Sequence, residues 1–214
     1  MRRNRDRWNH NIHYYDLVAD AVPSSARTAL DVGTGDGLLA TRLARTVPEV
    51  TGIDSDAAVI ERARRSAADA LTTTGASAVS SGAVSWIVGD ILTHDLPEAH
   101  YDAVVAVATV HHFPDLAVGL RRLAALTAPG GTLVLIGLAR SSTLHDRVLD
   151  AAGVVEHQVY SRTRGFWQHS APVQMSLPHT YTEVREIAAA ELPGAQWRRL
   201  PLWRYALIWK RSRR

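Results

Sequence analysis

Apolar positions recur along this chain in two patterns, short runs typical of strands and the spacing typical of helices. Together they predict a succession of strands and helices. Short apolar runs that end at glycine, proline or an acid predict seven strands, at residues 28–32, 50–53, 84–88, 101–108, 132–138, 196–200 and 204–209. Apolar positions at helical spacing predict helices at residues 8–22, 36–46, 56–71, 116–126 and 182–191. Strands and helices take turns up to residue 138, which predicts a parallel sheet with helices on both faces.

The pattern changes after residue 138. Residues 142–175 have weak periodicity and many bulky polar or aromatic side chains. The two final strands are separated by a very short turn at Pro201 and Leu202, so we expect an antiparallel pair at the end of the sheet. Because no repeat and no linker divides the chain, residues 1–214 are expected to form a single domain.

Composition narrows the class of protein. Hydrophobic residues make up 46% and charged residues 21% of the 214 positions, as in ordinary globular proteins. No apolar run reaches the ~18 residues of a membrane span, and the charged residues 1–7 are not followed by the apolar part of a secretory signal. We therefore expect a cytoplasmic protein. The chain has no cysteine, which excludes disulfides, thiolate metal sites and a cysteine nucleophile.

The net charge says less about the class of protein than the composition does. The net charge is +3, and much of the basic surplus consists of arginines near the two ends of the chain. A basic patch alone is weak evidence for nucleic-acid binding. We expect solvated termini, with a nucleic-acid contact as the alternative.

The most informative motif is the segment from Asp31 to Gly37, which follows the first predicted strand. Three glycines alternate there with small polar residues, and glycine lets a ligand approach the backbone. A dinucleotide-binding fingerprint would need a third glycine at Leu38, and Asp36 would repel a pyrophosphate at the start of the next helix. The motif therefore favours a ligand with an adenosine, no phosphate and a cationic amine, which describes S-adenosylmethionine (SAM).

Acidic residues lie at the ends of three successive predicted strands, at Asp31, Asp54 and Asp90. In an open α/β sheet, ligands bind beyond the carboxyl ends of the strands. Asp54 follows Gly33 by about 20 residues, the spacing of a ribose-binding acid, and a helix cap is the alternative role. We assign the cap to Asp56 instead. Asp31 is expected to attract the cationic amine beside the Gly33 backbone, with capping of nearby amides as the alternative.

Residues 28–138 resemble the class I SAM-dependent methyltransferases motif by motif, and residues 180–210 resemble them in architecture. The segments Val110–Phe113 and Ala128–Gly131 make the chain similar to small bacterial methyltransferases of the ubiquinone and menaquinone group. This resemblance implies an α/β, Rossmann-like fold with a seven-stranded, mostly parallel sheet, an antiparallel C-terminal hairpin strand and helices on both faces. It also implies SAM as cofactor and S-adenosylhomocysteine (SAH) as product.

The resemblance implies further roles for individual residues. Asp90 would accept a hydrogen bond from the exocyclic amine of adenine and Ile91 would pack on the ring, with a turn-forming aspartate as the alternative. Residues 1–23 would form a helical lid that brings His13 and Tyr14 to the cofactor or the acceptor. The predicted cofactor-binding residues are Asp31, Gly33, Thr34, Gly35, Asp54, Ser55, Asp90, Ile91, Ala106, His13 and Tyr14.

His111 is the candidate for acid–base chemistry, because histidine titrates near neutral pH and this residue follows the fourth predicted strand. A structural role for His111 is the alternative, and we do not expect both His111 and His112 to act. His10 and His13 have the spacing of a metal pair but no third ligand, so no metal site is expected.

Residues 142–175 lie where this fold places substrate-binding insertions. Their aromatic and bulky side chains would suit a planar or apolar small molecule, and the alternatives are packing of a cap or a dimer contact. These side chains are His157, Tyr160, Phe166, Trp167, His169 and Met175. Arg162 and Arg164 would pair with an acidic group of the substrate or lie on the surface.

The sequence therefore predicts methyl transfer from SAM to a small-molecule acceptor, at oxygen or nitrogen before an activated carbon. The alternatives are a tRNA or rRNA methyltransferase and a SAM-binding protein without catalysis. The fourth strand leads into Ala108–His111 and not into the Asn/Asp-Pro-Pro-Tyr segment of amino-directed nucleic-acid enzymes. We accordingly expect neither nucleic acid nor membrane as a partner, and the sequence carries no signal for an oligomeric state.

Overall fold

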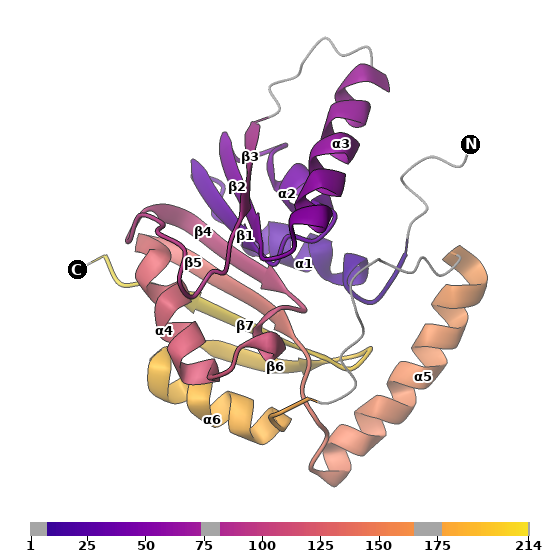
Figure 1. The fold of residues 1–214 in the computed structure, drawn as a ribbon. Helices are drawn as coiled ribbons and strands as arrows, with labels where there is room; N and C mark the ends of the chain where they lie inside the picture. Colours follow the sequence, from indigo (N-terminus) through magenta and orange to yellow (C-terminus); the bar gives the residue numbers. More distant parts are fainter. Residues whose placement is uncertain (1–7, 74–81, 165–176, 214) are drawn as a thin grey trace.

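The computed structural model describes residues 8–73, 82–164 and 177–213, and a single sheet runs through them (Figure 1). Its strand order is β3-β2-β1-β4-β5-β7-β6. Neighbours among the first five strands run parallel, and β7 runs antiparallel to both β5 and β6. The strands are β1 (Thr28–Val32), β2 (Glu49–Asp54), β3 (Ala83–Val88), β4 (Tyr101–Val107), β5 (Thr127–Gly137), β6 (Gln196–Leu200) and β7 (Arg204–Lys210). The predicted mostly parallel sheet with an antiparallel C-terminal hairpin is confirmed.

Helices cover both faces of the sheet, as the alternating pattern predicted. On one face α1 and α2 pack against the sheet through Val18, Leu39 and Leu43, and on the other α4 and α6 contribute Leu120 and Val184. Figure 1 shows α4 and α6 side by side, away from α1 and α2. The helical segments are η2 (Ile12–Tyr14), α1 (Tyr15–Ala21), α2 (Leu38–Leu43), α3 (Ala57–Thr73), η3 (Val110–His112), α4 (Leu116–Leu126), α5 (Leu144–Arg164) and α6 (Tyr181–Glu191).

The N-terminal helix begins later than the sequence predicted. The expected helix over residues 8–22 is wrong in its first part, because α1 begins at Tyr15 and a short 3-10 turn precedes it. Asn9 explains this turn, since its side-chain oxygen accepts the N–H groups of Asn11 and Ile12, both at 2.9 Å. Trp8 is 2% exposed and belongs to the core cluster that also contains α1 residues.

Helix α5 occupies a segment in which weak periodicity predicted no regular element. Its valines at positions 148, 155 and 159 are more than half exposed, so the usual apolar stripe does not face the core. Polar side chains face inward instead: Asp146 and Asp150 lie against Arg199 of β6. Asp146 also accepts the N–H groups of Ser142 and Thr143 just before the helix begins. Hydrophobic periodicity did not predict α5, because the helix is attached to the hairpin by the ion pairs of Asp146 and Asp150 with Arg199.

The predictions made for Phe166, Trp167, His169 and Met175 fall outside the described residues. Within the three described ranges, no helix combines the length and the apolar character that a membrane crossing requires.

Candidate functional site

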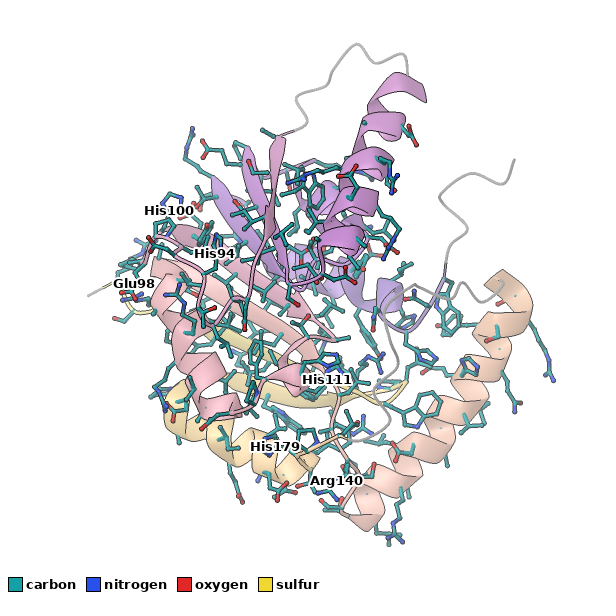
Figure 2. The ribbon with its side chains drawn as sticks, in the orientation of Figure 1. His94, Glu98, His100, His111, Arg140 and His179 are labelled. Carbon is teal, nitrogen blue, oxygen red and sulfur yellow. The ribbon has the colours of Figure 1, made fainter. Side chains whose placement is uncertain are left out.

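The carboxyl ends of four strands meet at one edge of the sheet. The order β3-β2-β1-β4 places Asp90, Asp54, Gly33 and Ala108 next to one another, because each follows or ends one of these parallel strands. The order reverses between β1 and β4, which is where open α/β sheets bind their ligands. Figure 2 shows His111 beyond β4 at this edge, and His100 at the opposite end of the same strand.

The glycine turn after β1 is held against its two neighbouring strands. The N–H groups of Gly33 and Thr34 both donate to Ile53 O of β2, at 2.8 and 3.0 Å. Gly33 has a φ of +66°, and a side chain there would overlap Thr109, whose hydroxyl donates to Val32 O at 3.0 Å. Gly35 also has a positive φ, but an added Cβ would meet nothing within 4 Å. The backbone of the turn is therefore held in place at Gly33 and leaves free space at Gly35. This arrangement suits a ligand-binding loop.

Asp31 is fully enclosed below this turn. Its Oδ2 accepts the Thr34 hydroxyl at 2.7 Å and the Ala40 N–H at 3.1 Å, so the carboxyl group caps the start of α2. Burial raises the pKa of Asp31 to about 7, the charge of Asp54 adds to this effect, and the two hydrogen bonds oppose it. The capping role, given above as the alternative, is what these contacts show. The same carboxyl is also poised to ionise when a cation approaches.

Asp54 and Asp56 divide two roles. The two oxygens of Asp54 each accept one backbone N–H, from Asp56 and from Gly35, both at 3.0 Å. Each oxygen thus keeps a free lone pair beside the open Gly35. Asp56 accepts the N–H groups of Ala58 and Val59 at 2.8 and 3.3 Å, which confirms that it caps α3.

The remaining predicted cofactor residues differ in exposure. Asp90 is exposed and accepts the Leu92 N–H at 2.9 Å, which is the turn-forming geometry. Ile91, beside it, is 6% exposed and belongs to the core. Ala106 is buried within β4, between β1 and β5, whereas Ser55 is exposed after β2. The roles of these residues in binding stay predictions.

The N-terminal segment presents Tyr15, and not Tyr14, to the acids of the glycine turn. The Tyr14 hydroxyl donates to Pro201 O at 2.5 Å, on the side of the terminal hairpin. Burial, with the charges of Asp31 and Asp36, raises the pKa of Tyr15 well above its usual value. His13 packs against the rings of Tyr14 and Tyr160. A helical spacing argument could have found Tyr15 as readily as its neighbour.

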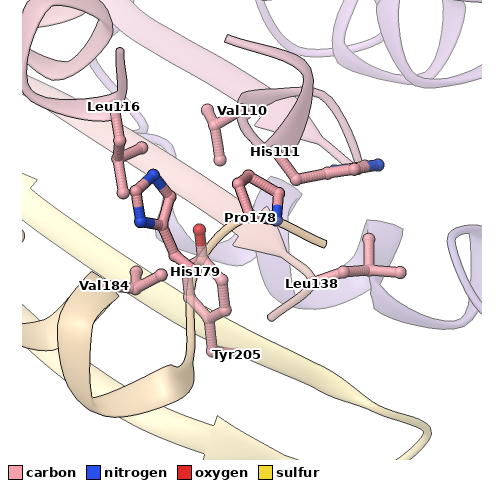
Figure 3. A pocket seen from close by; sticks show the side chains of 8 residues that line it. All are labelled: Val110, His111, Leu116, Leu138, Pro178, His179, Val184 and Tyr205. Atoms are coloured by element: carbon pink, nitrogen blue, oxygen red, sulfur yellow. The ribbon is translucent and has the colours of Figure 1, made fainter. Parts of the chain in front are cut away.

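His111 lies at the rim of a small pocket beyond β4. Its Nδ1 is buried and has no hydrogen-bond partner within the described part of the chain. Burial lowers the pKa of His111 to about 4, and the charges of His112 and Arg204 contribute. In Figure 3 its imidazole extends away from His179 and the Tyr205 hydroxyl. The residues that line the pocket are Val110, His111, Leu116, Leu138, Pro178, His179, Val184 and Tyr205.

This pKa bears on the predicted acid–base role. A general base works best when its pKa lies near the working pH. His111 is neutral at pH 7 and a weak base in the present environment, so hydrogen bonding to an acceptor suits it better than proton removal. Its catalytic role stays a prediction.

Sequence reasoning missed three residues that shape the site. Thr109 fixes the position of the glycine turn, and Trp86 packs over Gly37 and Gly52. Arg204, the first residue of β7, is buried, and its charge contributes to the lowered pKa of His111. Trp86 and Arg204 lie within predicted strands, where a side chain's partners depend on the sheet order and cannot be read from spacing.

Comparison with known proteins identifies the family of this chain. Residues 30–135 match the family described as "Methyltransferase domain". An uncharacterized methyltransferase of Mycobacterium tuberculosis (strain ATCC 25618 / H37Rv) is 40% identical over 203 residues, covering 95% of this chain and 96% of the relative.

Two further proteins are less similar. The ubiquinone biosynthesis O-methyltransferase of Alkalilimnicola ehrlichii is 33% identical over 127 residues, which span 59% of this chain and 48% of that protein. The crystal structure of magnesium protoporphyrin IX methyltransferase from Synechocystis PCC 6803 with bound SAH superposes with a TM-score of 0.60 at 20% identity, covering 94% of this chain and 81% of that one. From its match to the domain and to a relative over nearly the whole length of both chains, this protein belongs to the class I SAM-dependent methyltransferase family.

Proposed function

We propose that this protein transfers a methyl group from SAM to a small-molecule acceptor, at oxygen or nitrogen, in the cytoplasm. The observation that carries the proposal is the row of Asp90, Asp54 and Gly33 at adjacent strand ends, with His111 and its pocket beside it. The row offers carboxylates and bare backbone, which suit an uncharged nucleoside and a cationic amine. When bound, SAM supplies a methyl group on a sulfonium that is already activated for displacement.

Each residue at these strand ends is proposed to bind one part of SAM. Asp54 would accept both ribose hydroxyls with the lone pairs that its backbone contacts leave free. Asp31 would favour the amine by ionising, and Thr34 holds its carboxyl in place. Asp90 would accept from the adenine amine, and Gly35 leaves room for the ligand against its backbone. The protein's contribution to the rate is then chiefly orientation of the acceptor.

The segments on either side of the site would complete it. We propose that residues 1–23 act as a lid, because Tyr15 lies near Asp31 and because Arg42 of α2 pairs with Asp16 of α1. Residues 142–175 would lie on the acceptor side of the same single domain. The described part of that segment, α5, contacts the terminal hairpin through Asp150 and Arg199. A relative named as an O-methyltransferase supports oxygen as the methylated atom.

A methyl-transfer screen tests the proposal. The full chain is incubated with radiolabelled SAM and a cell extract, and the label is measured separately in RNA, protein and small-molecule fractions. We expect label in the small-molecule fraction, lost with Asp54→Ala. Label confined to RNA would replace the proposal by the nucleic-acid alternative. SAM binding without label in any fraction would favour a binding protein without catalysis.

A further inference from the structure

Two arginines of the terminal hairpin are both buried, but only one has a charged partner. The Arg199 side chain is 5% exposed, and its guanidinium lies 2.6 Å from Asp150 Oδ1 and 3.8 Å from Asp146 Oδ1. Arg204, five positions later, is 6% exposed. Among the described residues no carboxylate lies within 4.0 Å of its guanidinium. The hairpin therefore holds one neutralised cation and one that is not.

The hydrogen bonds of Arg204 use only part of its guanidinium. They go to neutral oxygens: Leu202 O at 3.3 Å, Trp203 O at 3.4 Å and Asn11 Oδ1 at 2.9 Å. The Nε–H is buried and has no hydrogen-bond partner in residues 8–73, 82–164 and 177–213. Burial lowers the pKa of Arg204 to about 10, while Tyr181 and Tyr14 oppose this effect, so the group stays charged at neutral pH.

A buried, unpaired charge is costly, and a protein that kept Arg204 for stability alone would be expected to give it a carboxylate. Arg199 shows that this hairpin can do so. The neutral oxygens around Arg204 hold its side chain in position without cancelling its charge.

Arg204 also lies at the functional edge of the sheet. The antiparallel register pairs Tyr205 of β7 with Gly137, the last residue of β5, so Arg204 lies beyond the carboxyl end of β5. β5 is itself the neighbour of β4. Tyr205 lines the pocket of His111. Arg204 lies close enough to His111 for its charge to contribute to the lowered pKa of that residue, after burial and the charge of His112.

We propose that Arg204 binds the carboxylate of the methyl acceptor, which makes the acceptor a small organic acid. The inference rests on the proposed function, because it assigns a chemical class to the acceptor of that reaction. A planar guanidinium matches a carboxylate geometrically, although it also matches phosphate. One uncompensated positive charge is neutralised by a monoanionic carboxylate, whereas a phosphate ester of about −1.5 to −2 would leave buried negative charge. The unpartnered His111 Nδ1 supplies a further hydrogen-bonding position at the same edge.

The test observes the arginine Nε–H groups directly by ¹⁵N NMR on the full chain, with and without SAH. Acetate and benzoate are the probes, acetamide and benzamide are their uncharged counterparts, and phosphate is the competing anion. We expect the Arg204 signal, assigned by its loss in Arg204→Gln, to shift saturably with the two carboxylates and with neither amide. The Arg199 signal serves as the internal control. It should not shift, because the guanidinium of Arg199 is already paired with Asp150 and Asp146.

Variants make the result specific. Arg204→Gln should weaken carboxylate binding about tenfold or more, the scale of hydrogen bonds to a charged group. Asn11→Ala removes one contact of Arg204 but keeps its charge, so it should retain the binding. Thermal unfolding establishes that each variant folds; if Arg204→Gln does not fold, Arg204→Lys assigns the signal, and the comparison with Arg199 stands on the unmodified protein.

Three results would overturn the inference: no saturable shift at Arg204 with either carboxylate, equal shifts at Arg204 and Arg199, or a stronger response to phosphate. SAH binding is measured by calorimetry on the same samples. A protein that binds no SAH would contradict the proposed function, while the carboxylate titration would still report on Arg204 itself.

Discussion

Asp54 and Asp56 form a matched pair of carboxylates two positions apart, one assigned to the ligand and one to the fold. Asp54→Ala should weaken SAM binding by about 1–3 kcal/mol, the scale of hydrogen bonds lost to a charged group. Asp56→Ala removes the cap of α3, so it should lower the free energy of unfolding by about 1 kcal/mol and leave SAM affinity nearly unchanged. Calorimetry and thermal unfolding of both variants check this division. Equal losses of SAM affinity would contradict it.

Asp31 makes SAM binding dependent on pH. With a pKa of about 7, its carboxyl is mostly protonated at pH 5.5 and half ionised at pH 7. If the cationic amine requires the carboxylate, SAM affinity should rise by on the order of tenfold over this interval. In Asp31→Asn the rise should disappear. A wild-type affinity that is flat between pH 5.5 and 7 would remove Asp31 from the amine site.

The same pKa has a consequence for stability without ligand. The folded state holds a proton on Asp31 that the unfolded chain releases above its usual pKa of 3.8, so this residue lowers the stability of the free protein as the pH rises from about 4 to 7. Asp31→Asn should therefore reduce that decline in the melting temperature measured over the same range.

At the scale of elements, the glycine turn couples β1 to the loop after β4. Gly35→Ala should cost about 1 kcal/mol, from its positive φ alone. Gly33→Ala should cost about 2–4 kcal/mol, because its Cβ also overlaps Thr109. Adding Thr109→Ala should recover part of that loss, so the two effects will not be additive. Denaturant unfolding of Gly33→Ala, Thr109→Ala and the double variant measures this; strict additivity would show that the turn and the loop are not coupled.

The N-terminal segment is joined to α5 by histidines. His10 Nε2 lies 2.9 Å from His157 Nδ1, and burial, with the charges of Arg204, His157 and His13, lowers the pKa of His10 to about 4. The unfolded chain takes up a proton near pH 6.5, so stability should fall as the pH drops from 6.5 toward 4, by about 1 kcal/mol at pH 5 after allowance for solvent screening.

His10→Gln should remove most of this fall in the free energy of unfolding. His145→Gln is the control, because His145 lies on the exposed side of the same helix and should keep the wild-type pH profile. If both variants behave like the wild type, the contact between His10 and His157 does not hold the segment to α5.

The same elements show what could be predicted from the sequence. β1, β2 and β4 were found because buried strands are apolar runs that end where the chain meets solvent. The acids at the ends of β1, β2 and β3 then located the site. α5 could not be found, because Asp146 and Asp150 face inward while its valines face solvent. Arg204 could not be found either, because its lack of a carboxylate partner depends on the fold.

For the molecule as a whole, the sheet order brings together residues that are far apart in the chain. Asp31 and Asp90 are far apart in the sequence, with Asp54 between them, but the three acids lie at the carboxyl ends of adjacent strands. The terminal hairpin adds Arg204 to the neighbouring part of the same edge. We therefore infer that this one edge of the sheet binds both the methyl donor and the acceptor.

The most direct test of this claim is a map of backbone amide chemical shifts when SAH is added to the full ¹⁵N-labelled chain. We expect saturable changes centred on Gly33, Gly35, the pair Asp54 and Ser55, and the pair Asp90 and Ile91, with little change at the opposite end of β4 around His100. Changes confined to another region, or no saturable change at all, would contradict it.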